Sequence, residues 1–275
     1  MSAGAAAARL SRSRVLRPAL RMQTPSLAAL LCLALPALAC RSNTAEPSPM
    51  TGAGTEAKPA AASARAPVQG YTLVLIKTGP KSGKLPEDEH KQAFAGHFAN
   101  MERMAEAGQL LVAGPYGEQR HDDALRGIFV LASDDPVEAQ GWAATDPTTQ
   151  AGVFVLEYHD LATDAPLADA LARDKAVRAQ WKAEGKTPAP GDGARPYVLL
   201  TAEHGDLARR ELGPLASRTG GVLLLGRLDG TRAFAILDAS DLEMARERFA
   251  PELANLGTCT LDEWYASDQL ALMVH

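Results

Sequence analysis

The sequence predicts an α+β fold made of two βαββαβ units that pack together within one chain. The first observation is that a series of apolar motifs occurs twice in the same order, beginning at Tyr71 and again at Tyr197. The second is that short alternating runs, typical of strands, are separated by longer runs with helical spacing. The third is that a sheet with helices on one face leaves its other face bare, so two such sheets would cover each other.

The first unit follows a stretch at 40–69 that is rich in Ala, Pro, Ser, Thr and Gly, which we interpret as a disordered tether. Its predicted elements are a strand at 71–77, a helix at 87–107, strands at 110–113 and 127–132, a helix that begins near 136 and ends before 146, and a strand at 153–158. This order defines the ferredoxin-like split unit. We place this domain at 70–164.

The second unit repeats the order after a helical and Pro/Gly-rich linker at 165–196. Its predicted elements are a strand at 197–202, a helix at 206–217, strands at 222–228 and 232–237, a helix at 241–249 with Ser240 as N-cap, and a strand at 258–264. It is shorter than the first unit around its first helix and its central hairpin, which are connections that tolerate deletion. Residues 197–275 therefore read as a degenerate second ferredoxin-like copy, and the two copies would place eight strands around a shared interior.

Residues 1–39 have the features of an export signal. An arginine-rich, acid-free segment precedes an apolar run that is too short to span a bilayer comfortably. The run from Ala37 to Cys40 resembles a bacterial lipobox, although Leu is commoner at the position of Ala37. We expect lipidation of Cys40 and anchoring in a cell-envelope membrane; a secreted or periplasmic chain cleaved after Ala39, a cytoplasmic chain, and a start at Met22 are the alternatives.

Charge and cysteine content narrow the classes of function. The chain has 28 basic and 33 acidic residues, and loss of 1–39 would remove arginines but no acid. Because the chain is acidic, it lacks the basic surface that binds phosphates, and no nucleic-acid partner is expected. Cys259 reads as a small buried residue of an alternating strand, and no internal disulfide is expected with Cys40. No cluster with metal spacing and no phosphate loop occurs, so neither a metal nor a cofactor is expected.

Several motifs of the first unit occur in the order found in one known family. They are a histidine early on the first helix (His97), Leu-Leu-x-Ala-Gly-Pro at 110–115, and Trp-Ala-Ala-Thr-Asp-Pro at 142–147 followed by Ala-Gly-Val at 151–153. Residues 71–162 thereby resemble the YCII-related family, and Gly-Pro-Tyr at 114–116 with Glu118 resembles its DGPF-type subgroup. The resemblance implies the dimeric α+β barrel, also found in small monooxygenases and lactone isomerases, here formed within one chain.

The resemblance also implies that His97 and Asp146 converge in a pocket as a catalytic pair. Asp146 would accept the Nδ1 proton of His97 and orient its ring for general acid–base chemistry. From the residues alone, a partly buried structural histidine is the favoured interpretation of His97, and Asp146 is equally a turn aspartate bonded to its local backbone. Tyr116 and Glu118 follow the Gly-Pro turn and are expected at the mouth of the pocket.

The second copy lacks both groups of this pair. Its register places Arg209 at the position of His97 and Pro251 at the position of Asp146. We therefore interpret the second copy as a structural partner that closes the barrel, leaving at most one site in each chain. The polar hairpin segment at 121–123 (His-Asp-Asp) is interpreted as solvated rather than as a metal site.

Two functions remain open. The first is an exported, lipid-anchored YCII-related domain protein that performs cofactor-free acid–base chemistry (an isomerase, lyase or hydrolase step) on a small molecule through His97 and Asp146. The second is a non-catalytic lipoprotein that binds a small molecule or another partner. A homo-oligomer is allowed but not required, because the second unit covers the sheet of the first. The sequence does not name the ligand.

Overall fold

The computed structural model describes residues 69–189, 191–216 and 221–273. The expected export signal, Cys40 and almost all of the expected tether lie outside these ranges. Within them, no helix combines the length and apolar character needed to cross a membrane. All structural statements below concern the described ranges.

Eight strands alternate with helices along the chain. The first half contains β1 (Gln69–Thr78), α1 (Glu87–Glu106), β2 (Leu110–Pro115), β3 (Leu125–Leu131), α2 (Pro136–Ala143), α3 (Pro147–Gln150), β4 (Phe154–Thr163) and α4 (Leu167–Ala183). The second half contains β5 (Ala194–Ala202), α5 (Gly205–Ala216), β6 (Val222–Leu228), β7 (Arg232–Leu237), α6 (Leu242–Arg248), α7 (Ala250–Leu256), β8 (Cys259–Ser267) and the 3-10 helix η2 (Asp268–Leu272).

The strands form one antiparallel sheet in the order β2-β3-β1-β4-β6-β7-β5-β8, which curls into a nearly closed barrel. The two halves meet at two seams. At the first seam, β4 pairs with β6 from Leu161↔Leu228 to Thr163↔Gly226. At the second seam, β2 approaches β8, where Trp264 Nε1 donates a hydrogen bond to Gly114 O at 3.0 Å and Tyr116 bridges to Trp264. The expected α+β class and shared eight-stranded interior are therefore present.

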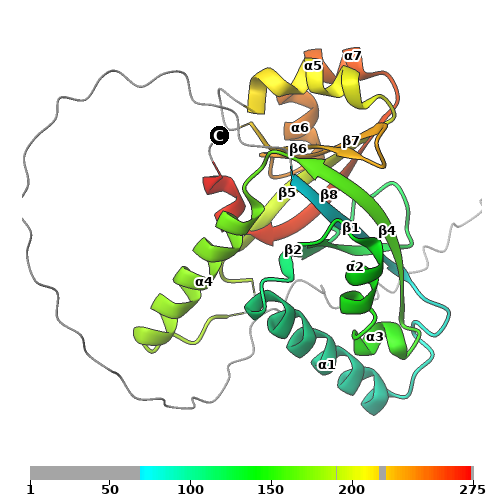
Figure 1. Ribbon diagram of the computed structural model, residues 1–275, viewed down its shortest axis with the longest axis vertical. Coiled ribbons are helices and arrows are strands. Elements are labelled where there is room, and N and C mark those ends of the chain that lie inside the picture. Colours follow the sequence, from blue (N-terminus) through cyan, green and yellow to red (C-terminus); the bar gives the residue numbers. More distant parts are fainter. Residues whose placement is uncertain (1–68, 190, 217–220, 274–275) are drawn as a thin grey trace, which may run out of the picture.

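Helices cover the outside of the barrel on two sides (Figure 1). Helices α1, α2 and α3 gather over the strands of the first half, and α5, α6 and α7 gather over those of the second half. Each group buries an apolar layer against its strands. In the first half this layer includes Met104 of α1 and Phe129 of β3, and in the second half Leu212 of α5 and Ala235 of β7.

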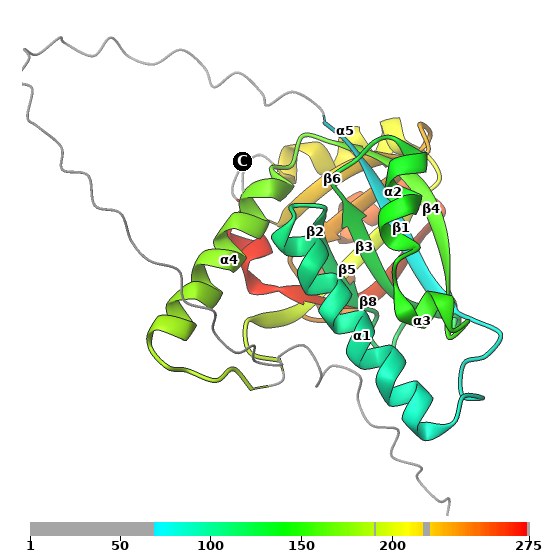
Figure 2. The same ribbon diagram turned by 60° about the horizontal axis from the view of Figure 1, so that its bottom comes forward.

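The barrel interior is a third apolar core, and it is closed at one end only. Side chains from all eight strands alternate into it, because successive strand residues point to opposite faces. At one end, Leu167 of α4 and Leu270 of η2 join this interior cluster and act as a plug. Figure 2 shows α4 beside η2 at that end. At the other end the inward positions of the strands become polar, and this end forms the cavity described below.

Glycine ends α1 as the sequence predicts. Gly108 has a φ of +73°, which is the left-handed region that glycine enters without steric cost. Its amide bonds Ala105 O at 3.0 Å, and the amide of Gln109 bonds Met104 O at 2.8 Å, so the last carbonyls of the helix are satisfied before the chain turns into β2.

Several predicted boundaries were wrong. The N-cap of α6 is Asp241, whose side chain accepts from Met244 N, and Ser240 instead donates to Asp241 Oδ2. The helix predicted at 241–249 is α6, and a second helix that was not predicted, α7, follows it directly with Pro251 in its first turn. Strand β5 starts at Ala194, inside the predicted linker, because β8 extends to Ser267 and pairs with it.

Candidate functional site

His97 and Asp146 lie side by side between helix α1 and the start of α3. His97 Nδ1 lies 2.5 Å from Asp146 Oδ2, and the two side chains are 9% and 2% exposed. Since an ionised carboxylate only accepts hydrogen bonds, Nδ1 carries the proton. Helical spacing turns His97 inward on α1, and Asp146 is held by the extended backbone that precedes Pro147.

Asp146 is also the N-cap of α3. Its Oδ1 accepts hydrogen bonds from Thr148 N at 2.9 Å, from Thr149 N at 3.3 Å and from the Thr148 hydroxyl. Burial raises the pKa of Asp146. The hydrogen bond and charge of His97 and the hydrogen bonds from Thr148 lower the pKa by more, so the pKa lies below its ordinary value. Asp146 therefore combines two interpretations that the sequence left open, namely a local turn aspartate and a partner of His97.

Aromatic rings enclose His97. Its ring stacks on Phe129 with centroids 6.0 Å apart, and it meets Phe94, Phe98 and Phe154 edge-on. Among the described residues, its Nε2 has no hydrogen-bond partner. Neither of the two hollows described below is lined by His97.

The other residues named by the sequence fall in different places. Tyr116 lines a cavity at the open end of the barrel. Glu118 is exposed and is not among the residues that line it. Arg209 lies on α5, and Pro251 lies in the first turn of α7, so the structure records neither an imidazole nor a carboxylate at these two positions of the second half.

The cavity at the open end has a volume of about 220 Å³ and is lined by both halves of the chain. That space equals roughly seven water molecules at about 30 Å³ each, so it suits a small ligand. Its floor is apolar and its mouth is polar. The apolar lining comes from Leu73, Leu75, Leu125, Leu228 and Phe234, and the polar and sulfur-bearing lining comes from Lys77, Tyr116, His121, Asp122, Glu157, His159, Thr201, Glu203, Arg232, Thr258, Cys259, Thr260 and Asp262.

A second histidine–aspartate pair spans the two halves at this cavity. His121, in the loop between β2 and β3, places Nδ1 at 2.9 Å and 2.8 Å from the two carboxylate oxygens of Asp262 on β8. The backbone amide of His121 donates to Asp262 Oδ1 at 2.6 Å. The Asp262 side chain is 3% exposed, whereas the His121 side chain is 48% exposed. The buried carboxylate thus fixes a histidine that solvent reaches.

A third histidine lies on the inward face of β4. His159 Nδ1 lies 2.9 Å from Asp229 Oδ2, and Arg232 binds the same carboxylate. Burial raises the pKa of Asp229, but the hydrogen bonds from Arg232 and His159 lower it more. Beside them, a hydrogen bond from Lys77 lowers the pKa of Glu157, whose Oε2 lies 2.8 Å from Lys77 Nζ. The basic side chains of Lys77 and Arg232 are therefore each already paired with a carboxylate.

One buried polar atom in the cavity, Thr260 Oγ1, has no hydrogen-bond partner among the described residues. His159 Nε2 is also buried, and it lies 3.1 Å from Glu157 Oε1, within ion-pair distance. Buried polar groups are nearly always paired with protein, water or ligand, so Thr260 Oγ1 marks a place where a bound molecule would be stabilised. The half-buried Cys259, a free thiol whose pKa burial raises, also lines the cavity.

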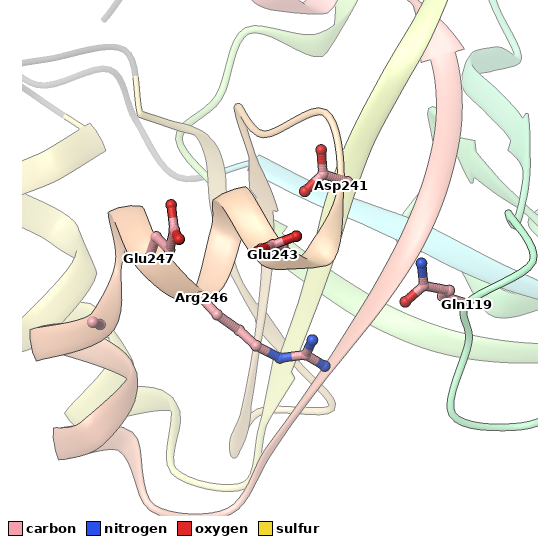
Figure 3. A pocket seen from close by; sticks show the side chains of 6 residues that line it. Gln119, Asp241, Glu243, Arg246 and Glu247 are labelled. Carbon is pink, nitrogen blue, oxygen red and sulfur yellow. The ribbon is translucent and has the colours of Figure 1, made fainter.

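A larger but superficial hollow, about 610 Å³, lies outside the barrel. Figure 3 shows its side chains, with Asp241, Glu243, Arg246 and Glu247 on or beside α6 and Gln119 in the β2–β3 loop. All but Asp241 are exposed surface residues, and Asp241 serves as the cap of α6. The smaller cavity is enclosed by core strands and holds the unpaired Thr260 Oγ1, so it is the better candidate for a site. In the part of the chain that the structure describes, no group of His, Cys, Asp and Glu residues could hold a metal ion.

Sequence reasoning missed the His121–Asp262 pair. The segment around His121 was interpreted as solvated, and the second half as purely structural. One signal was present in β8: Asp262 alternates with Trp264 and therefore lies on the face that turns toward the core. A carboxylate on a buried strand face needs a partner, but the sequence does not indicate which loop supplies it.

Comparison with known proteins places a YCII-related domain at residues 71–161. The matched segment covers β1 through most of β4 and includes both His97 and Asp146, but it does not reach the second half. No curated protein and no solved structure matches the chain. Residues 71–161 are thus a YCII-related domain.

Proposed function

We propose that this protein binds a small molecule in the cavity at the open end of the barrel. The observation that carries the proposal is Thr260 Oγ1, a buried hydroxyl oxygen without a partner among the described residues, in a cavity with an apolar floor. Ordered water or a ligand in this space would satisfy it. The ligand would touch both halves of the chain, because both contribute to the lining.

Thr260 offers a test of this proposal. Thr260 lies on the same face of β8 as the inward-turned Asp262, so Thr260→Phe would place a larger side chain in the cavity. We expect small fragments detected by ligand-observed NMR, or a molecule retained on purification and seen by native mass spectrometry, to be lost in this variant. The matched control is Thr231→Phe, at an exposed threonine that does not line the cavity, which should bind as wild type does. Binding that is indifferent to Thr260→Phe would place the ligand elsewhere.

A second candidate is cofactor-free acid–base catalysis by His97 and Asp146. It is favoured by the 2.5 Å contact between Nδ1 and Oδ2 and by an Nε2 atom that has no partner among the described residues. The enclosure of the ring by phenylalanines counts against it, because a substrate would have to displace at least one ring. Binding of the molecule that is retained on purification should be weakened by His97→Gln if this candidate is right, and unaffected if the barrel cavity is the site.

We also propose that the second half is a degenerate copy of the first. The strand order β2-β3-β1-β4 in the first half and β6-β7-β5-β8 in the second half support this, because each runs second, third, first and fourth along the sheet. This is the strand order expected of two ferredoxin-like units in an intramolecular dimeric α+β barrel. An experimental structure in which β5–β8 with α5 fails to superpose on β1–β4 with α1 would contradict it.

The export signal and lipid anchor remain part of the proposal. The arginine-rich start, the apolar run and Cys40 support a cell-envelope lipoprotein that presents its cavity outside the cytoplasm. Cleavage after Ala39 without lipidation, giving a secreted or periplasmic protein, is the alternative.

A further inference from the structure

The second histidine–aspartate pair has the geometry of a proton-transfer site. Asp262 is buried and receives both the ring Nδ1 and the backbone amide of His121, so the ring is fixed in position and in tautomer. Its Nε2 then holds the lone pair of the neutral imidazole, and this atom has no partner among the described residues. His121 is 48% exposed and lines the cavity, so its ring is accessible to a bound molecule.

We propose that His121 is the general base of the barrel cavity and that Asp262 is its positioning residue, acting on a small uncharged molecule with an apolar body and an acidified C–H bond. The inference rests on the proposed binding function and adds the reaction and the substrate class. The first half supplies the base and the second half supplies the carboxylate, 141 residues apart in sequence. Neither half contains the site alone.

The lining of the cavity determines the substrate class. Four carboxylates line the cavity, against one lysine and one arginine. These two basic side chains are already paired, Lys77 with Glu157 and Arg232 with Asp229. An anionic substrate would meet net repulsion and no unpaired cation. The apolar floor and the volume of about 220 Å³ favour a short hydrocarbon or ring body instead.

The proposed step is balanced without a cofactor. His121 Nε2 removes a proton from carbon, the electron pair of the C–H bond passes to a neighbouring carbonyl as an enolate, and Asp262 stabilises the resulting imidazolium. The same proton is returned to another atom of the substrate, which makes the reaction an isomerisation. Tyr116 lines the cavity as a neutral hydrogen-bond donor, since burial and the charges of Asp262 and Asp122 raise its pKa far above the ordinary value.

The two histidine–aspartate pairs differ in accessibility. The His97 side chain is 9% exposed and lies among four phenylalanines, whereas His121 is 48% exposed at the cavity mouth. Both pairs use Nδ1 toward a buried carboxylate. The distinction is therefore testable by comparing the same substitution in each pair.

The probe is 5-nitro-1,2-benzisoxazole, an uncharged aromatic molecule. A general base removes its C–H proton, the C–H electron pair forms a nitrile, and the N–O bond breaks to leave a coloured phenolate. In the full-length protein we expect His121→Gln to lower the rate at least about tenfold, because general-base contributions are on the order of 10²–10⁴. The control His90→Gln should leave it unchanged, and a rate that falls with His97→Gln instead would overturn the assignment.

Asp262→Asn tests positioning separately from folding. We expect the ring ¹⁵N shifts of His121 to change from those of the Nδ1–H tautomer to those of a mixture of tautomers. The rate should fall, while the denaturation midpoint should stay close to that of the wild type and of His90→Gln. An unchanged tautomer would remove Asp262 from the site. Should Asp262→Asn not fold, the His121→Gln comparison alone decides.

Binding is followed independently by methyl NMR shifts of Leu73 and Leu75 at the cavity floor. If the probe binds there but His121→Gln reacts as fast as wild type, or if the rate depends on His97 instead, the base assignment is overturned and the binding function stands. If the probe neither shifts these signals nor reacts, both are overturned.

Discussion

Gly114 on β2 and Gly226 on β6 occupy corresponding places at the two seams of the barrel. A Cβ on Gly114 would lie 1.8 Å from Tyr265 O, and a Cβ on Gly226 would lie 2.6 Å from Leu161 Cδ1. Each glycine therefore permits a close approach between strands of the two halves.

Gly114→Ala should destabilise the barrel strongly. The new methyl group would meet a backbone oxygen that cannot move without disturbing β8, so we expect a loss of at least about 3 kcal/mol in the free energy of unfolding. The control is Gly141→Ala in α2, where a Cβ meets nothing within 4 Å, and this change should stabilise by roughly 0.5–1 kcal/mol. Urea titration followed by circular dichroism measures both. Equal behaviour of the two variants would argue against a tight β2–β8 seam.

Trp264→Phe should weaken the same seam through the lost hydrogen bond. Trp264 is fully buried, and its Nε1 donates to Gly114 O at 3.0 Å, so the substitution leaves a buried carbonyl unpaired and a small void. We expect a cost of about 1–3 kcal/mol. Trp181→Phe on α4 is the control and should cost less, because Trp181 is only partly buried. A smaller effect at Trp264 than at Trp181 would contradict this role.

Asp146→Asn should change how stability depends on pH. The folded-state pKa of Asp146 is lower than its ordinary value, so its ionised form stabilises the fold above about pH 4, and this contribution is lost as the pH falls through the folded pKa. The variant should be less stable by roughly 1.5–3 kcal/mol near neutral pH and should approach wild type below about pH 3. Asp241→Asn, at the partly exposed N-cap of α6, serves as the matched control. A constant difference across the pH range would contradict a folded-state pKa of Asp146 below its ordinary value.

Cys40→Ser tests the anchor. If Cys40 is lipidated, the wild-type protein should fractionate with membranes and mass spectrometry should find acyl chains on an N-terminal Cys40, whereas the variant should be soluble. An unmodified N-terminus at Cys40 would indicate ordinary secretion. Retention of residues 1–39 on cytosolic protein would contradict export altogether.

The fold class was predictable because strands and helices have different periods. Alternation placed β6 and β7 at their observed bounds, and Gly108 and Pro147 marked helix boundaries. The bounds that were predicted less accurately, such as the start of β5 and the end of β8, depend on pairing between strands that are distant in the sequence. That pairing is decided by the register of the whole sheet, which local propensity does not contain.

The sequence by itself predicted the order of strands and helices and contained the YCII-like motifs, and the resemblance implied a contact between His97 and Asp146 that the structure shows. Only the tertiary structure decided that aromatic rings enclose this pair, and that Asp262 reaches across 141 residues to orient His121 at an open cavity. The physical reason is that strand alternation indicates which side chains turn inward, but barrel closure decides which inward side chains meet. The polar end of the barrel therefore depends on the approach of β2 to β8, which brings His121 to Asp262.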